Sequence, residues 1–307
     1  NASRRLGHLS IRPTRRGSLL MQRRTSISAK ISLATLFIVA LLALLGPYLP
    51  IQDPAAFHPE QSLQAPAWLQ QPVLGTDAYG RDLLARTIWG ARVSLLVGLL
   101  GTLVALLVGV PYGAISGFLG GRTDRIMMRL ADTMESVPMV AFVLFLLSIL
   151  QEYRSEMAAL GIGRLHLLFF AVGLLFWLPT ARVARSEALR LRDTAFSQAA
   201  TAVGSSPIRT LKKHILPHLA APVIVMLGLT LPRVILMEAF LSFLGLGVEA
   251  PNVSWGSLAS EGLASMNPLI AGHWLFLVPA AALATTLLAL HTLGDHLRDR
   301  FEKSRRL

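Results

Sequence analysis

Two histidines, His214 and His218, stand four residues apart, a spacing that on one helical face can bring two imidazoles to a metal ion. Pro217 lies between them and interrupts such a face, so we expect helix-end histidines near backbone carbonyls and no metal site. A phosphate-binding loop places a lysine after glycine, but none of the four lysines here follows a glycine. The glycine-rich stretches GLGVEAPN and GIGRLH follow no expected strand, so they are typical of turns. We therefore expect no enzymatic activity and no bound cofactor in this chain.

The segment around these histidines, residues 196–218 (FSQAATAVGSSPIRTLKKHILPH), combines small and basic residues between two long apolar runs. Its first half favours a short helix with a small-residue face, which Gly204 can end with a left-handed turn. Ser205 or Ser206 can cap a second helix, and Pro207 suits its first turn. The pattern predicts a helical hairpin suited to docking, with a simple linker as the alternative. The residues expected to carry the docking are Gln198, Ala199, Ala200, Gly204, Ser205, Pro207, His214 and Pro217.

The elements that hold this hairpin are expected to be membrane spans. The chain has 307 residues, of which 53% are hydrophobic, and its mean hydropathy is +0.55. Backbone groups that face lipid must be paired within their own segment, which predicts helices. Six apolar blocks reach or approach the length that crosses the ~30 Å hydrocarbon core, which predicts an all-α membrane protein with a six-helix transmembrane bundle. The blocks are 31–49, 93–115, 138–150 extended by its flanks, 165–180, 219–246 and 274–290.

The net charge of +12 is compatible with nucleic-acid binding, but the basic residues are sorted by loop. The segment before the first span, the loops after the second and fourth spans, and the tail together hold 23 of the 29 Lys and Arg residues. By the positive-inside rule, both termini and the hairpin are expected to face the cytoplasm. The first apolar block is too long for a cleaved signal peptide and is expected to be an anchor. We expect membrane lipid, and no nucleic acid, as a partner.

Residues 198–218 resemble the cytoplasmic loop of the permease subunits of bacterial ABC importers. The family pattern is Glu-Ala-Ala, three residues, Gly, nine residues and a hydrophobic-Leu-Pro close; here Gln198 stands in place of the usual glutamate. Three further stretches narrow the resemblance to the second permease subunit of the dipeptide, oligopeptide and nickel branch, the dipeptide permease C-like group. They are VLGTDAYGRDLLARTIWGARVSL, EAFLSFLGLGVEAPNVSWG and LHTLGDHLRDR. The resemblance covers roughly residues 31–300.

This resemblance implies the type I ABC importer permease fold, in which the hairpin is a coupling helix that docks into a cleft of a separate ATPase. It also implies four kinds of partner in the bacterial inner membrane system: a homologous second permease subunit, two ATP-binding-cassette ATPase subunits, an extracytoplasmic substrate-binding protein and lipid. ATP and Mg are then bound by the ATPases. Peptides are the expected substrate; nickel, glutathione or antimicrobial-peptide import, or a membrane scaffold that transports nothing, are alternatives.

The expected organisation has five parts along the chain. They are a basic, disordered cytoplasmic segment (1–29), a first transmembrane helix (30–50), an extracytoplasmic loop with an interfacial helix (51–90), a permease core with the coupling loop 184–218 (91–297), and a basic cytoplasmic tail (298–307).

The expected interfacial helix lies in the stretch GTDAYGRDLLAR. Thr76 or Asp77 can cap this helix, and Gly80 allows close approach. Charged residues such as Arg81 and Asp82, set against the apolar residues 83–85, would make the helix amphipathic. Such a helix would lie on the membrane surface, dock the binding protein, or do both.

Two ionisable residues, Arg233 and Glu238, fall within the fifth apolar block. Intramembrane charges are costly and usually face an interior or a water-filled cavity. At ~100° per residue, positions five apart point about 140° away from each other, so we expect no direct pair. Packing, gating and lining of the substrate path are the roles open to them.

Overall fold

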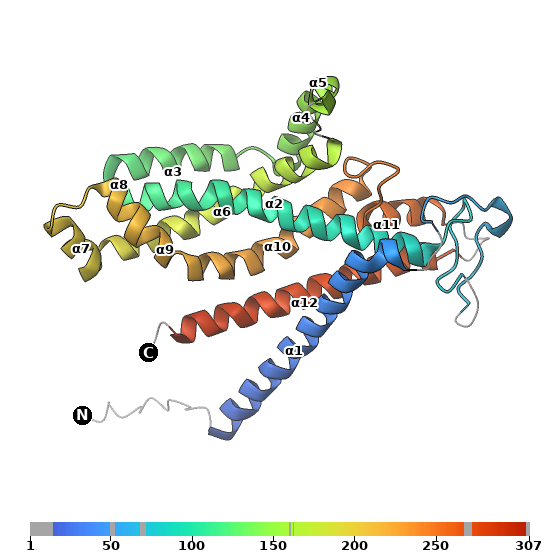
Figure 1. The fold of residues 1–307 in the computed structure, drawn as a ribbon, viewed down its shortest axis with the longest axis horizontal. Helices are drawn as coiled ribbons and strands as arrows, with labels where there is room; N and C mark the ends of the chain where they lie inside the picture. Colours follow the sequence, from blue (N-terminus) through green and yellow to red (C-terminus); the bar gives the residue numbers. More distant parts are fainter. Residues whose placement is uncertain are drawn as a thin grey trace, which may run out of the picture.

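Long helices that lie alongside one another make up most of the fold (Figure 1). The structure is a computed structural model, and the residues that it describes are 15–49, 53–67, 72–159, 161, 163–266 and 272–304. Among these residues the one extended pairing is an isolated bridge between Thr76 and Asp82. The all-α class that the sequence predicted is therefore confirmed.

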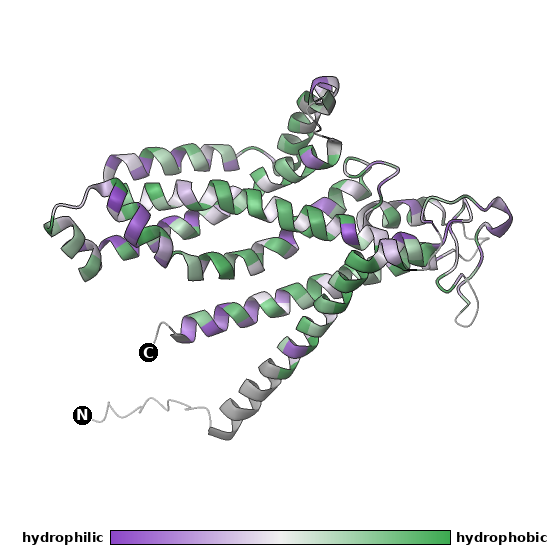
Figure 2. Ribbon diagram, in the orientation of Figure 1, coloured by the Kyte–Doolittle hydropathy of each residue, from purple (hydrophilic) through white to green (hydrophobic). Residues whose placement is uncertain are grey.

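Within the described residues, five helices are long and apolar enough to cross a membrane. The shortest of them, α10, has 24 residues, which at ~1.5 Å per residue is about 36 Å, more than the hydrocarbon core requires. Figure 2 shows apolar residues along the middle of these helices and more hydrophilic residues towards the end of α12. The five are α1 (Arg15–Leu45), α2 (Leu83–Leu119), α6 (Arg164–Arg192), α10 (Ala220–Phe243) and α12 (Trp274–Ser304).

Two of these helices begin earlier than the sequence predicted. Helix α1 starts at Arg15, so residues 15–29 are helical where disorder was expected for 1–29; residues 1–14 lie outside the described residues. Extending a helix backwards from an apolar span costs far less than nucleating one, because each added residue gains its own hydrogen bond. Helix α2 starts at Leu83, inside the loop that was expected to run from 51 to 90.

The third expected span, 138–150, does not form a membrane-length helix. It becomes α4 (Met139–Glu152), whose 14 residues extend about 21 Å, and it is separated from α3 (Gly121–Glu135) at Pro138. Proline lacks the N–H that would continue α3, and it disfavours a helical conformation in the residue before it. Figure 1 shows α3 alongside α2, whereas α4 and the short α5 (Arg154–Ala159) project away from the bundle. The count of six spans is therefore not confirmed at this block.

Helices α2 and α6 touch backbone to backbone along a row of glycines. Gly109, Gly113 and Gly117 are four residues apart and so lie on one face of α2. A Cβ added at each of these glycines, in the same order, would lie 2.5, 2.0 and 2.3 Å from the backbone carbonyl oxygens of Trp177, Ala181 and Arg185 in α6. No side chain other than hydrogen fits there. Small residues at this spacing let membrane helices approach closely, which fixes α6 and the segment that follows it.

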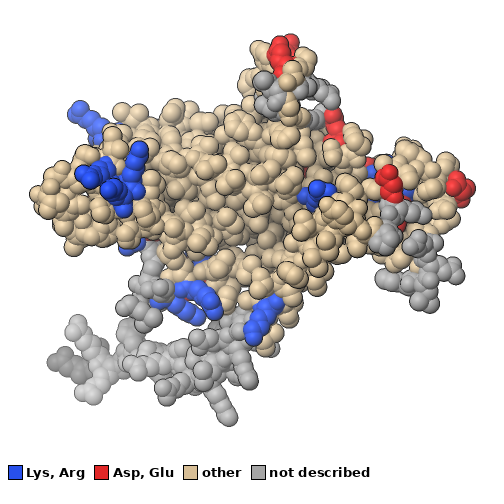
Figure 3. Space-filling model, viewed as in Figure 1, with Lys and Arg blue, Asp and Glu red and all other residues tan. Residues whose placement is uncertain are grey.

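Many large apolar side chains lie on the outside of the bundle. Phe37, Leu107 and Leu288 are each about two-thirds exposed, as suits helices that face lipid. Figure 3 shows a group of Lys and Arg at the end of the molecule that carries α7 to α9 and others on the lower side and near the middle of the view, while the Asp and Glu side chains in view lie towards the other end and on the projecting part that carries α4 and α5. This distribution agrees with the positive-inside rule, and the orientation of the termini stays a prediction.

Candidate functional site

The segment between α6 and α10 forms the helical hairpin that the sequence predicted; we use "hairpin" for residues 195–218. Helix α7 (Ala195–Ala202) ends before Gly204, whose φ of +81° is left-handed. Helix α8 (Pro207–Thr210) begins with Pro207 in its first turn, and the Ser206 hydroxyl accepts a hydrogen bond from the Arg209 N–H at 3.4 Å. Ser205 also shapes the turn, because its N–H donates to the Ala200 carbonyl at 3.0 Å. The glycine turn and the serine cap are therefore confirmed.

The tip of the hairpin exposes apolar side chains that the sequence reasoning did not single out. Val203 is 85% exposed and Ile208 is 68% exposed, one on each side of the Gly204 turn. Figure 1 shows α7 and α8 at the extreme end of the bundle. Exposed apolar residues at the tip of a projecting hairpin are typical of a protein contact. The available sequence signal was that Val203 and Ile208 are the large aliphatic residues of the stretch 197–210, which is otherwise small, polar or basic apart from Pro207.

The base of the hairpin is packed into the bundle. Ile215 and Leu219 are buried against Ala188 and Leu191 of α6, so the hairpin is carried on the same helix that the glycine row fixes. Gln198 lies on the exposed side of α7, and its amide donates to the Asp193 carbonyl at 3.2 Å. A movement of α6 or α10 therefore moves the hairpin.

The two histidines lie at this base without facing a common ligand position. The chain stays helical past Pro217, through a π-helical segment (Leu211–Ile215) and α9 (Leu216–His218), where an interrupted helix face was expected. In the wider π turn, the N–H of Leu216, the residue before Pro217, donates to the Leu211 carbonyl. Nδ1 of His218 contacts the His214 carbonyl oxygen at 2.6 Å, and its ring stacks on Phe196 with centroids 4.9 Å apart.

At the opposite end of the bundle, residues 75–82 form a turn, which we call the outer turn, instead of the expected interfacial helix. Asp77 folds the turn on itself, because its Oδ1 accepts the N–H groups of Tyr79 and Arg81 at 2.8 and 3.0 Å. Gly80, with φ +73°, passes so close to the His58 carbonyl that a Cβ would lie 1.8 Å from its oxygen. Self-bonding of this kind by aspartate competes with a helix.

The helix cap is supplied later than expected, by Asp82 rather than by Thr76 or Asp77. Oδ1 of Asp82 accepts the Leu84 N–H at 2.8 Å at the start of α2, and burial raises the pKa of this carboxyl while the backbone hydrogen bonds oppose that shift. The Thr76 hydroxyl is used elsewhere: it donates to the carbonyl of Gln61, the last residue of the 3-10 helix Pro59–Gln61.

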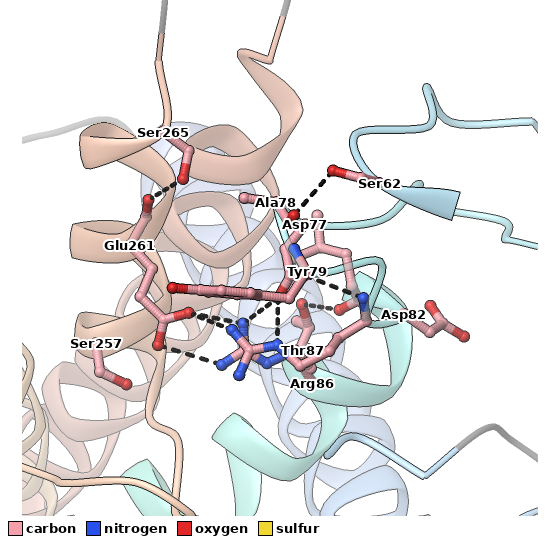
Figure 4. Close-up of polar contacts among 12 residues, drawn as sticks. Ser62, Asp77, Ala78, Tyr79, Asp82, Arg86, Thr87, Ser257, Glu261 and Ser265 are labelled. Atoms are coloured by element: carbon pink, nitrogen blue, oxygen red, sulfur yellow. Dashed lines mark hydrogen bonds and ion pairs between the residues drawn. The ribbon is translucent and has the colours of Figure 1, made fainter. Parts of the chain in front are cut away.

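Four charged side chains join the outer turn, α2 and α11 (Trp255–Ala264) in what we call the charge network (Figure 4). Arg86 is 2% exposed, and its Nη1 donates to Asp77 Oδ2 at 2.6 Å and to Glu261 Oε2 at 2.7 Å. Arg81 contacts the same two carboxylates, with its Nε 2.6 Å from Asp77 and its Nη2 3.0 Å from Glu261. Two cations are thus balanced by two carboxylates, one of them from a helix about 175 residues away along the chain.

Beside the charge network lies a cavity of about 520 Å³ whose lining includes Phe57 and Tyr79. Both rings are more than half exposed, and they pack edge to face with centroids 5.7 Å apart. The Arg81 guanidinium lies 4.9 Å from the Tyr79 ring centroid and 5.6 Å from that of Phe57. The outer turn therefore presents an ordered aromatic and cationic surface.

In α10 the two ionisable residues have different surroundings. Glu238 is fully buried, and its carboxylate accepts hydrogen bonds from the hydroxyls of Ser94 (3.1 Å) and Ser242 (2.7 Å). Ser94 in turn accepts the Trp255 N–H at 3.2 Å, which links α2, α10 and α11. Arg233 was expected to face an interior or a water-filled cavity; it is exposed on the surface of this chain and borders a cavity. The partners of Glu238 are serines, so the two charges do not pair, as helical geometry predicted.

Comparison with known proteins identifies the family. Residues 109–307 match the model of the binding-protein-dependent transport system inner membrane component. The chain belongs to this family. As a member, it has the type I ABC importer permease fold, and it is a permease that crosses the membrane several times.

Relatives of this permease extend over most of the chain. It is 41% identical over 225 residues to the oligopeptide transport system permease protein OppC of Haemophilus influenzae, which covers 73% of this chain and 68% of that protein. It is 36% identical over 277 residues to the dipeptide transport system permease protein DppC of Bacillus subtilis, covering 88% and 81%. With OppC of Escherichia coli the identity is 37% over 280 residues, covering 90% and 88%. The resemblance to this branch is therefore confirmed.

The family match contains some of the candidate residues and leaves out others. The hairpin, Arg233, Glu238 and Glu261 lie within residues 109–307, whereas the outer turn and Arg86 precede that range. The charge network therefore connects the matched part of the permease to the segment before it, through Glu261 on α11.

Proposed function

We propose that this permease is one of two membrane subunits of an ABC importer for di- or oligopeptides in the bacterial inner membrane, with both termini in the cytoplasm. The observation that carries the proposal is the hairpin: an apolar tip, set on a buried base, at the basic end of a bundle of membrane helices. The names of the relatives, which are oligopeptide and dipeptide transport permeases, support peptides as the substrate.

In this proposal the hairpin docks into a cleft of a separate ATPase subunit. Ala199 and Ala200 allow a close approach, and Val203 and Ile208 supply apolar contact area at the tip. Two such ATPases bind ATP and Mg, and this chain transmits their closure to the spans without catalysing hydrolysis. Because the hairpin base packs on α6, its displacement reaches the bundle directly.

At the outer end, the proposal assigns the docking of an extracytoplasmic substrate-binding protein to the outer turn. Phe57, Tyr79 and Arg81 have the composition of interaction hot spots, in which aromatic and arginine side chains dominate the binding energy. The charge network holds Arg81 and the turn in one geometry, so little ordering is needed when a partner binds. Thr76, Gly80 and Asp82 act by shaping that turn.

Glu238 is assigned a gating role in the same proposal. Its carboxylate joins Ser94 of α2 to Ser242 of α10, and through Ser94 it reaches the start of α11. Hydrogen bonds buried among three helices can be made in one state of an alternating-access gate and broken in the other. The homologous second permease would supply the other half of the path.

The proposal is tested by purification of this permease together with its second permease, ATPases and binding protein. We expect two ATPase chains to copurify and ATP hydrolysis to increase when the binding protein is added. Ala200→Arg should remove the ATPases while the second permease remains bound, because bulk and charge enter the cleft. Ala55→Arg, at an exposed alanine of the outer loop, is the matched control and should change nothing. Equal loss in both variants, or full ATPase binding by Ala200→Arg, would contradict the proposal.

A further inference from the structure

Arg233 lies near the middle of α10 with its charge unmatched. At ~1.5 Å per residue it is about 20 Å from the first residue of the 24-residue helix. Its side chain is exposed, and among the described residues no hydrogen bond or ion pair involves it. A guanidinium stays charged at any physiological pH, so it cannot escape the cost of a membrane position by losing a proton.

The position of Arg233 indicates what this face of α10 meets. Ile224, Leu236 and Phe240 are also exposed on α10, and by themselves they would suit contact with lipid. A cation at mid-membrane does not, because intramembrane charges face a bundle interior or a water-filled cavity. The face that carries Arg233 is therefore expected to line an enclosed or aqueous space.

A cavity of about 220 Å³ lies next to Arg233, where α3, α4 and α6 meet. Its walls are mostly apolar, and they include Phe142 and Trp177. Glu135 is the other charged residue in the lining, and Arg182 of α6 already occupies it: Nη1 donates to Glu135 Oε1 at 3.1 Å, and Nη2 donates to Oε2. Of the two charged residues in this lining, Arg233 is therefore the one whose side chain can still bind a ligand. The site combines one cation with an apolar recess.

We propose that this site binds the C-terminal end of the transported peptide, with the Arg233 guanidinium holding the carboxylate and the adjoining cavity receiving an apolar side chain. The inference rests on the proposed function. A peptide importer must handle varied side chains, and the terminal carboxylate is common to all unmodified peptides. Arginine binds carboxylates through two parallel N–H···O bonds, and the apolar walls keep water from competing with them.

The test compares two probes in the complete importer reconstituted into proteoliposomes. The probes are labelled tri-alanine with a free carboxylate and the same tripeptide as its C-terminal amide. The variants are Arg233→Gln and Arg233→Lys, with Leu236→Gln as the control on the same exposed face. For each probe, uptake by the variant is divided by uptake by the unmodified importer, which cancels any preference of the binding protein. Copurification with the partner subunits confirms that each variant assembles.

We expect Arg233→Gln to lower uptake of the free tripeptide about tenfold to a hundredfold, as the loss of charge-assisted hydrogen bonds implies, and to leave the ratio for the amide near one. Arg233→Lys should fall in between, because it keeps the charge and loses the bidentate geometry. Leu236→Gln should not distinguish the probes. Equal losses for both probes would overturn the inference and point to an acidic partner on the second permease; undiminished uptake of the free tripeptide would also overturn it. Failure of the unmodified importer to take up either probe would instead contradict the proposed function, and the inference with it.

Discussion

Replacing Gly204 by valine tests the hairpin without disturbing its packing. Gly204 has φ +81°, and a Cβ added there would meet nothing within 4 Å, so the substitution acts through the backbone alone. For an L-residue the left-handed conformation costs about 1–2 kcal/mol, and a β-branched residue tolerates it least. At ~1.4 kcal/mol per factor of ten, the equilibrium constant that favours the docking-competent turn should fall about fivefold to thirtyfold. The apparent affinity for the ATPase falls with the populated fraction of that turn, so this factor is the upper bound of the loss.

The assay is titration of purified ATPase subunits onto the permease pair, with the dissociation constant as the readout. Gly204→Asn is one control, since asparagine adopts the left-handed conformation more readily than other non-glycine residues. Gly245→Val is the other: Gly245 has φ +76° and the same open surroundings, but it follows the far end of α10. We expect only Gly204→Val to weaken ATPase binding, by at most about fivefold to thirtyfold. Equal affinities for Gly204→Val and Gly245→Val would refute the reasoning.

Three further predictions concern other parts of the chain. Arg86→Gln should lower the stability of the detergent-solubilised permease by about 3 kcal/mol, because it leaves two carboxylates of the charge network facing a single cation; an unchanged melting temperature would contradict this. The hydrogen bond from Arg185 lowers the pKa of the Asp124 carboxyl below its ordinary ~3.9, so this pair contributes stability above about pH 4 that is lost as the pH falls through the folded-state pKa. Melting temperatures measured from pH 6 to pH 3 should therefore drop further in the unmodified permease than in Asp124→Asn, and parallel curves would show that the pair contributes nothing. Gln198→Glu should not strengthen ATPase binding, because a carboxylate cannot donate to the Asp193 carbonyl as the amide does; a gain that fades as salt is raised would favour an electrostatic role instead.

Local signals in the sequence were enough to predict the hairpin and most of the spans. A glycine that needs a positive φ, a serine cap and a proline in the first turn act over a few residues, so Gly204, Pro207 and a cap at Ser205 or Ser206 could be predicted without knowledge of the fold. The spans were found because a membrane helix must be apolar over its whole length. The block that begins at Pro138 was located correctly, but it was expected to cross the membrane, and the 14 residues of α4 are too few for that.

Long-range contacts could not be predicted in this way. Nothing near Arg86 in the sequence indicates Glu261, since the two meet only when α11 packs against the start of α2. The outer turn was mistaken for a helix because Asp77 and Asp82 are both plausible caps, and the choice depends on the contact of Gly80 with the His58 carbonyl. The exposure of Arg233 likewise follows from how α10 packs in the bundle and not from its hydropathy.

Peptide uptake by the complete importer tests the central claim most directly. Proteoliposomes would contain this permease, its second permease and the ATPases, with ATP inside and the binding protein and labelled tri-alanine outside. The account predicts accumulation that requires both ATP and the binding protein, and that Ala200→Arg abolishes. Accumulation that does not need the binding protein, or that survives Ala200→Arg unchanged, would contradict the claim that the hairpin couples ATPases to a binding-protein-dependent path.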